Sequence, residues 1–147
     1  MTLDEITAYV HEHFPMTRCL GARVEHYDGA SVRLAAPLAP NLNNGATAFA
    51  GSLSALAILA GWVLLHLQLR DRGVPNRLVI QRTELDFDHP VEGDFTATAV
   101  LPAAAVWDRF LATLARHRRA RVAVSSTLAS VAGARGRHLG TYVATRA

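Results

Sequence analysis

The sequence predicts an α+β domain in which one curled antiparallel β-sheet wraps around a long apolar helix. One observation is that no Asp, Glu, Lys or Arg occurs between Arg33 and Arg70. The second half of this stretch suits a helix that protein buries on nearly every side. The other observation is that the rest of the chain reads as six short strands and two further helices. Only an antiparallel sheet can then cover the long helix.

Length and composition bound the kind of protein. The 147 residues fit one compact domain, residues 1–147, with a core of its own. Half of the residues are hydrophobic and 18% are charged, which is typical of a globular chain. The net charge of +3 is too small an excess to indicate a nucleic-acid partner. Cys19 is the single cysteine, so we expect neither a disulfide framework nor a multi-cysteine metal site.

The first predicted elements are a helix and a hairpin. Thr2 and Glu5 have the spacing of a capping box, so a helix begins there, and Pro15 follows its end. The alternating pattern of residues 22–27 and the segment 31–38 predict two strands. The dipeptide Asp28-Gly29 between them is typical of a tight hairpin turn.

The long helix is predicted over residues 48–70, with Gly73 and Pro75 just past its end. Its length approaches that of a membrane span, but polar residues such as Ser52 and His66 interrupt it and arginines do not gather at one end. We therefore expect no membrane insertion. The first ten residues have neither the basic nor the apolar region of a signal peptide, so we expect a cytoplasmic location.

The second half of the chain predicts the remaining strands. They are expected over residues 78–88, 95–101, 121–131 and 138–145, with an amphipathic helix around residues 107–114 and a turn at 133–136. Strict alternation in the third strand assigns one set of residues to its inner face: Val79, Gln81, Thr83, Leu85 and Phe87. The polar Gln81 and Thr83 are then predicted to reach a substrate.

Three segments carry a resemblance to a known family. They are PLAPNLNNGATAFAGSLSALAILAGW at 37–62, FDHPVEGDF at 87–95 and GTYVATR at 140–146. With them, essentially the whole chain resembles the hotdog fold. More narrowly, it resembles the thioesterase family that also occurs fused behind a GNAT-type acetyltransferase, the YiiD C-terminal family.

The resemblance implies an activity and an assembly. It implies hydrolysis of an acyl thioester of coenzyme A or of an acyl-carrier protein, with coenzyme A as part of the substrate and no separate cofactor. In hotdog proteins the third strands of two chains pair, which implies a homodimer or a dimer of dimers. The alternative, from a different functional class, is a non-catalytic acyl-CoA-binding or regulatory hotdog module.

The resemblance also suggests site residues. The narrower family reads Phe-Gly-Gly-Ser where this chain has Phe49, Ala50, Gly51 and Ser52, and Asn43 stands where the broader motif has its asparagine. The broader motif also has a histidine in this loop and a carboxylate in the helix, and this chain has neither.

The N-terminus of the buried helix predicts an oxyanion site. Free backbone amides around Ala50, Gly51 and Ser52 meet the positive end of the helix dipole, where negative charge is favoured. Gly51 and Ser52 are therefore predicted to be catalytic, with Phe49 and Ala50 beside the substrate. A simple helix start is an equal interpretation for Ser52. Asn43 is predicted to place water or the carbonyl.

Two questions stay open at this point. The residues do not identify a general base, and His66 suits a core histidine better than a base. The cluster RHRRAR at 116–121 is the one basic run. Arg118 and Arg119 are predicted to hold the phosphates of coenzyme A or an acidic carrier surface. The alternative for this cluster is a solvated surface, and for Asn41 and Asn44 a turn role is favoured.

Overall fold

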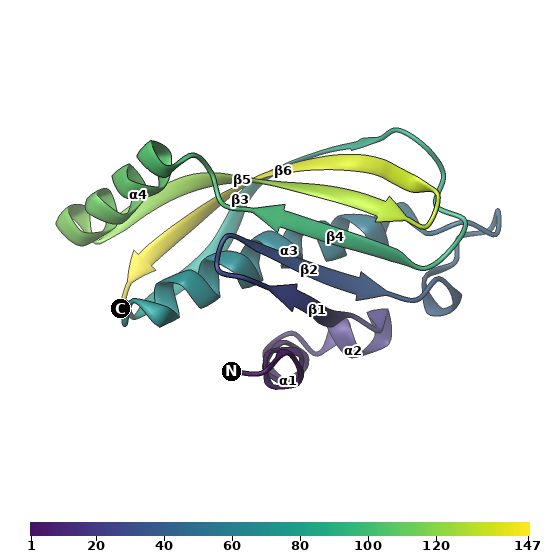
Figure 1. The fold of residues 1–147 in the computed structure, drawn as a ribbon, viewed down its shortest axis with the longest axis horizontal. Coiled ribbons are helices and arrows are strands. Elements are labelled where there is room, and N and C mark those ends of the chain that lie inside the picture. The colour runs from purple at the N-terminus through teal and green to yellow at the C-terminus, as the bar shows by residue number, and fades with distance from the viewer.

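The computed structural model describes all 147 residues as one sheet with four α-helices. Six antiparallel strands lie in the order β1-β2-β4-β5-β6-β3, and the sheet curls over α3 (Figure 1). This is the α+β hotdog arrangement that the sequence predicted. The elements are α1 (Leu3–His13), α2 (Met16–Leu20), β1 (Arg23–Tyr27), β2 (Ser31–Ala36), the 3-10 turn η1 (Ala39–Asn41), α3 (Ala50–Asp71), β3 (Asn76–Phe87), β4 (Phe95–Val100), α4 (Ala104–His117), β5 (Arg119–Ser130) and β6 (Gly133–Arg146).

The central helix α3 is the core of the molecule. It is 22 residues long and apolar enough to cross a membrane by length and composition, yet twelve of its residues are buried inside the protein. Gly61 lets the sheet approach it closely, because a Cβ there would collide with the side chain of Tyr142. Tyr142 is fully buried, and its hydroxyl donates to the carbonyl oxygen of Ile58 at 2.7 Å. The contact fixes β6 against the first half of α3.

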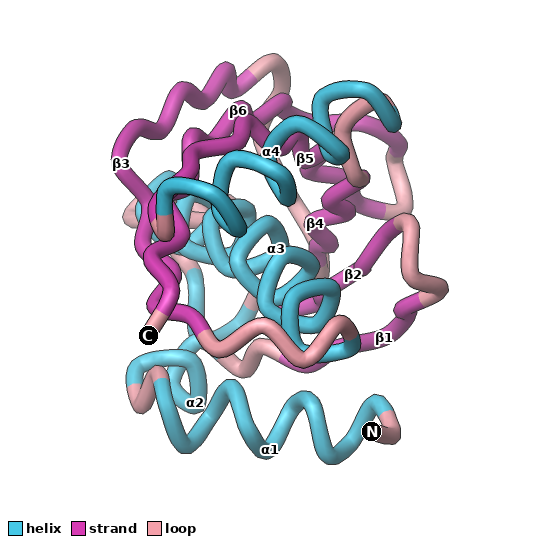
Figure 2. Tube along the Cα trace, turned by 90° about the vertical axis from the view of Figure 1, so that its left-hand side faces the viewer, coloured by secondary structure: helices cyan, strands magenta, loops and turns pink.

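The N-terminal helices close the side of α3 that the sheet leaves open. Figure 2 shows α1 and α2 crossing this side, between the edge strands β1 and β3. The predicted capping box is present, since the Glu5 amide donates to Thr2 Oγ1 at 3.2 Å and Glu5 Oε2 accepts from the Thr2 amide at 2.7 Å. The sequence analysis did not predict α2, which follows Pro15 directly and ends at Gly21, whose φ is +73°.

The strict alternation predicted for β3 is wrong in its first half. Leu78 is buried and Val79 is half exposed, so the inner positions there are the opposite of those expected. A β-bulge between Ile80 and Arg82 shifts the register against β6. Beyond the bulge, Thr83 lies on the inner side as predicted, and Gln81 is exposed at the bulge itself. One extra residue in a strand reverses the faces of the residues that follow.

Helix α4 and the start of β5 cover the C-terminal end of α3. The guanidinium of Arg72, just past α3, lies 5.6 Å from the centroid of the Trp107 ring of α4. Arg118 ends α4 in a left-handed conformation, with φ at +59°, and Arg119 opens β5. The predicted basic cluster is therefore at the opposite end of α3 from its N-terminus, about 33 Å away by the rise of a 22-residue helix.

Candidate active site

Two backbone amides at the start of α3 have no partner in the protein. Phe49 is the N-cap residue, and its side chain cannot cap. The amides of Ser52 and Leu53 donate to the Phe49 carbonyl oxygen at 3.0 and 3.1 Å. The amides of Ala50 and Gly51 have no such acceptor, so they remain free at the positive end of a 22-residue helix.

The loop before α3 is held by its own hydrogen bonds. The Phe49 amide donates to the Asn41 carbonyl oxygen at 2.7 Å, and the Ala48 amide donates to the Val91 carbonyl oxygen at 2.8 Å. These two bonds tie the chain just before the free amides to η1 and to the segment before β4. The free amides are therefore carried on a loop with defined contacts on both sides.

Both polar atoms of the Asn43 side chain make hydrogen bonds within this loop. Its Oδ1 accepts from the amides of Gly45 and Thr47 at 2.7 and 3.1 Å, and its Nδ2 donates to Thr47 Oγ1 at 2.7 Å. The side chain stabilises the turn, and Asn43 is not one of the residues that line the pocket beside α3. Its Nδ2 also lies 3.5 Å from the Ala48 carbonyl oxygen, two residues before the free amides.

Asn41 is the asparagine that reaches the pocket, and the sequence analysis had favoured a turn role for it. The residue is 4% exposed, and its Nδ2 donates to the carbonyl oxygens of Leu20 and Pro37 at 2.8 and 2.7 Å. Two carbonyl neighbours fix the orientation of the amide. Its Oδ1 has no protein partner and is not sealed from solvent, so it is the polar atom that Asn41 offers to the pocket.

The pocket at the start of α3 has a volume of about 310 Å³. Ser52 lines it, and the Ser52 hydroxyl makes no hydrogen bond within the protein. The ring of Phe49 lies over Gly51 so closely that any Cβ at this position would collide with it. Three of the predicted residues, Phe49, Gly51 and Ser52, therefore line this pocket, and Ala50 does not. The residues lining the pocket are Met16, Cys19, Leu20, Pro40, Asn41, Phe49, Gly51, Ser52 and Ala55.

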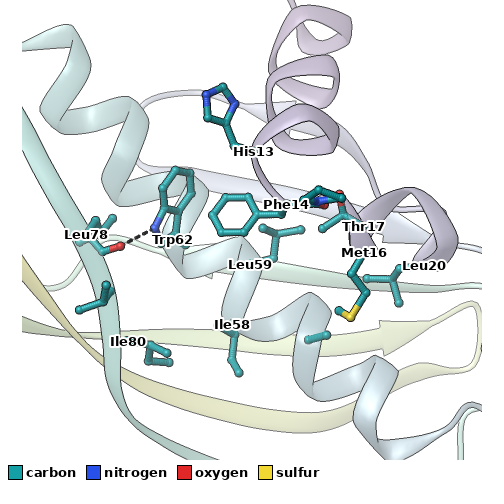
Figure 3. A pocket seen from close by; sticks show the side chains of 13 residues that line it. His13, Phe14, Met16, Thr17, Leu20, Ile58, Leu59, Trp62, Leu78 and Ile80 are labelled. Atoms are coloured by element: carbon teal, nitrogen blue, oxygen red, sulfur yellow. Dashed lines mark hydrogen bonds between the residues drawn. The ribbon is translucent and has the colours of Figure 1, made fainter.

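A larger apolar cavity of about 620 Å³ adjoins this pocket. The two share Met16, Leu20 and Ala55, so they lie side by side along α3. Figure 3 shows the cavity between the α1–α2 turn, α3 and β3, with Trp62 Nε1 donating to the Leu78 carbonyl oxygen at 2.9 Å. Ten of its thirteen lining residues are hydrophobic, which suits an acyl chain.

Three of the polar side chains predicted elsewhere, those of Gln81, Arg118 and Arg119, do not line the pocket. Gln81 is exposed at the β-bulge. Arg118 and Arg119 lie at the far end of α3, where Arg119 lines a separate groove with Arg109 and Arg121. Within one subunit, a ligand that bridged the pocket and these arginines would have to span most of the helix.

His138 is a further buried polar residue that the sequence analysis did not consider. It is 3% exposed, and its Nε2 lies 2.6 Å from Thr83 Oγ1. Burial lowers the pKa of His138 from its usual 6.5, so the ring is neutral at pH 7. No signal in the sequence links the two, because 55 residues separate them. No group of three or more His, Cys, Asp or Glu side chains could hold a metal ion.

The fold and the pocket together define a hotdog protein of the thioesterase class. Residues 3–146 match the model of the family described as "Putative thioesterase (yiiD_Cterm)", and the chain belongs to this family. The resemblance seen in the sequence is therefore confirmed.

Solved structures show the same fold. A protein of unknown function from Chlorobaculum tepidum has a TM-score of 0.92 at 24% identity, with 98% of this chain and 94% of that chain covered. A protein from Shewanella oneidensis, titled a putative thioesterase, has a TM-score of 0.87 at 24% identity, with 97% and 96% covered. A Pseudomonas aeruginosa protein titled a probable thioesterase has a TM-score of 0.85 at 22% identity, with 100% and 97% covered.

Proposed function

We propose that this protein hydrolyses acyl thioesters of coenzyme A or of an acyl-carrier protein at the N-terminus of α3. The observation that carries the proposal is the pair of free amides on Ala50 and Gly51, whose polar N–H groups lie beside a pocket that shares Met16, Leu20 and Ala55 with a larger apolar cavity. A thioester has the same division, with a polarised carbonyl at one end of an apolar chain.

The free amides supply the electrostatic part of the reaction. As water attacks the thioester carbonyl, negative charge develops on its oxygen, and the two N–H groups donate to it. The positive end of the α3 dipole adds to this stabilisation. One preorganised donor of this kind lowers the barrier by about 3–4 kcal/mol, because it is aimed before the charge appears.

The polar side chains of the pocket bind the water and the carbonyl. Asn41 Oδ1 is a free acceptor that can orient a water molecule, and it takes the place that we had predicted for Asn43. The unpaired hydroxyl of Ser52 is a second group in the same pocket. The acyl chain runs from the amides past Ala55 into the apolar cavity.

The substitution Ala50→Pro tests the oxyanion site. Ala50 is the first residue of α3, where proline is favoured, and Phe49 has φ −63° and ψ 132°, which a following proline accepts. The change removes one of the two free N–H groups without disturbing the helix. We expect kcat to fall about 10²–10³-fold. Unchanged thermal unfolding provides the control, and an unchanged kcat would exclude this amide from the reaction.

A free-thiol release assay separates hydrolysis from simple binding. The panel contains acetyl-, octanoyl-, dodecanoyl- and benzoyl-CoA, together with one acyl-carrier protein. Turnover of any member supports the proposal. Saturable binding without turnover of any member would instead support the non-catalytic acyl-CoA-binding module. The same panel tests Arg118→Ala/Arg119→Ala, for which the prediction is a higher KM for acyl-CoA with little change in kcat.

We further propose a cytoplasmic homodimer that forms through β3. This strand pairs only with β6, so its other edge is free to pair with a second copy. Val79 and Phe87 of β3 are 52% and 50% exposed, and burying them favours association. Arg82 and Glu84 already form an ion pair within the chain at 2.6 Å. Sedimentation at micromolar concentration would contradict the dimer if it gave only the 15.9 kDa monomer.

A further inference from the structure

The pocket at the start of α3 lacks a group that can take a proton from water. Its polar side chains are Asn41, Ser52 and Cys19, with no carboxylate and no histidine among the lining residues. Hydrolysis by water needs such an acceptor, since the attacking oxygen must lose a proton as it bonds to the carbonyl carbon. A candidate acceptor outside this lining lies on the strands that face α3.

Thr83 and His138 form a hydroxyl–imidazole pair on the inner side of the sheet, in which the imidazole is buried and the threonine is exposed. Thr83 Oγ1 lies 2.6 Å from His138 Nε2, a distance at which a nucleophile or water-binding hydroxyl shares its proton with a base. The β-bulge at Gln81 turns Thr83 to the inner side. Gly140 is paired with Thr83 on β6, and a Cβ there would fall 2.9 Å from His138 Cε1. The missing side chain therefore makes room for the ring.

The surroundings keep the imidazole neutral and leave one nitrogen unpaired. Ser126 of β5 is paired with His138, and Leu85 of β3 is paired with it on the other side. The pKa of His138 is lowered by burial alone, without a contribution from any charged side chain. When Nε2 accepts from Thr83, the ring proton is on Nδ1, which is buried without a partner. The neutral ring therefore presents an unprotonated Nε2 to the Thr83 hydroxyl.

The pair lies level with the first turns of α3. Trp62 Nε1 donates to the Leu78 carbonyl oxygen at 2.9 Å, which places the middle of the helix against the start of β3. Ser126 of β5 is paired with His138, and its hydroxyl donates to the Ala57 carbonyl oxygen at 3.4 Å, so His138 lies beside the second turn of α3. Thr83 is also exposed, whereas His138 behind it is not. A water molecule can therefore meet the hydroxyl but not the ring.

We propose that Thr83 and His138 form the proton relay of the thioesterase site, in which Thr83 binds the attacking water and His138 accepts the proton. This inference rests on the proposed function. The water oxygen bonds to the carbonyl carbon, and the carbonyl electron pair moves to the oxygen held by the Ala50 and Gly51 amides. The water proton passes to Thr83 Oγ1 while the Thr83 proton passes to His138 Nε2.

The second half of the step restores the relay. The oxyanion re-forms the carbonyl, and the carbon–sulfur bond breaks with its electron pair on sulfur. The proton returns from His138 through Thr83 to the leaving thiolate. The products are a carboxylic acid and a thiol, and no oxidant or cofactor takes part. Thr83 touches the reacting water, and His138 acts through Thr83.

Substitutions at Thr83 test the relay. Thr83→Val keeps the shape and removes the hydroxyl, so we expect kcat to fall about 10²–10⁴-fold. Thr83→Ser retains the hydroxyl and should retain most of the activity. The matched control is Thr127→Val, the same change on the exposed outer face of β5. If Thr83→Val hydrolyses its best acyl-CoA at the wild-type rate, the relay is wrong while the proposed hydrolase stands. If the wild type hydrolyses no thioester, the proposed function itself fails.

Substitutions at His138 separate proton transfer from packing. His138→Gln can still hydrogen-bond to Thr83 but cannot accept a proton, so kcat should fall as it does for Thr83→Val. In the wild type, kcat should decline only below pH 6.5, because burial lowers the pKa of His138 and its protonated form cannot act. This acidic limb should vanish in His138→Gln and persist in the control His89→Gln, an exposed histidine. An acyl ester on Thr83, found by intact-protein mass spectrometry during turnover, would overturn attack by water.

Discussion

The clearest test of the proposed binding mode is to narrow the passage between the pocket and the apolar cavity. Ala55 is half-buried on α3 and lines both spaces. The substitution Ala55→Leu adds three carbon atoms at this junction and keeps a good helix former. It should leave the pocket at the free amides accessible and block the route into the cavity. Short acyl groups should therefore be unaffected, while long ones lose their binding site.

The size of the effect follows from the number of acyl-chain methylenes that the substitution keeps out of the cavity. Each methylene that enters an apolar cavity contributes about 0.8 kcal/mol, or roughly fourfold in kcat/KM. Ala55 lies four residues beyond Gly51, about 6 Å along the helix, so an octanoyl chain would place about four methylenes past it. Excluding them should lower kcat/KM for octanoyl-CoA by about 3 kcal/mol, which is roughly 200-fold.

The assay is thiol release measured across saturated acyl-CoAs of increasing length. In the wild type, kcat/KM should rise with each added methylene, and in Ala55→Leu the rise should stop after the first few carbons. The control variant is Ala105→Leu, the same change on the exposed side of α4. If Ala55→Leu lowers all lengths equally, or leaves the long chains unchanged, the acyl chain does not run from the amides into this cavity.

Three further predictions concern stability. Gly61→Ala should lower the free energy of unfolding by about 1–3 kcal/mol in urea, because overpacking against Tyr142 exceeds the gain of about 1 kcal/mol from alanine in a helix; an increase would contradict this. Tyr142→Phe should lower it by about 1 kcal/mol, since the hydrogen bond to Ile58 O is lost; an unchanged urea midpoint would count against that bond. The Ser31 amide, His26 and the Ala30 amide lower the pKa of Asp28 from 3.8 to about 2. Its stabilising contribution should be complete above pH 3.8 and disappear as pH falls through about 2, and a carboxyl titration by NMR with its midpoint near 3.8 would disprove the shift.

The features that the sequence predicted are those that neighbouring residues determine. The capping box of α1 and the turn at Asp28 depend on contacts within three or four residues. The unbroken apolar stretch requires burial from several sides, so the central helix and the enclosing sheet followed from hydrophobicity alone. The free amides at residues 50 and 51 were also predictable, because every helix begins with unpaired N–H groups.

Only the tertiary structure decided which polar side chains share a site. Asn41 and Asn43 are equally good turn residues in sequence, but Leu20 and Pro37 hold Asn41 toward the pocket while Thr47 keeps Asn43 in the loop. Relative to the predicted alternation, the bulge in β3 reverses the faces of the residues before it. The bulge arises from pairing with β6 rather than from a local sequence pattern. Thr83 and His138 meet across 55 residues. Local sequence determines the conformation that each residue favours, whereas strand register and packing between distant segments decide which residues are in contact.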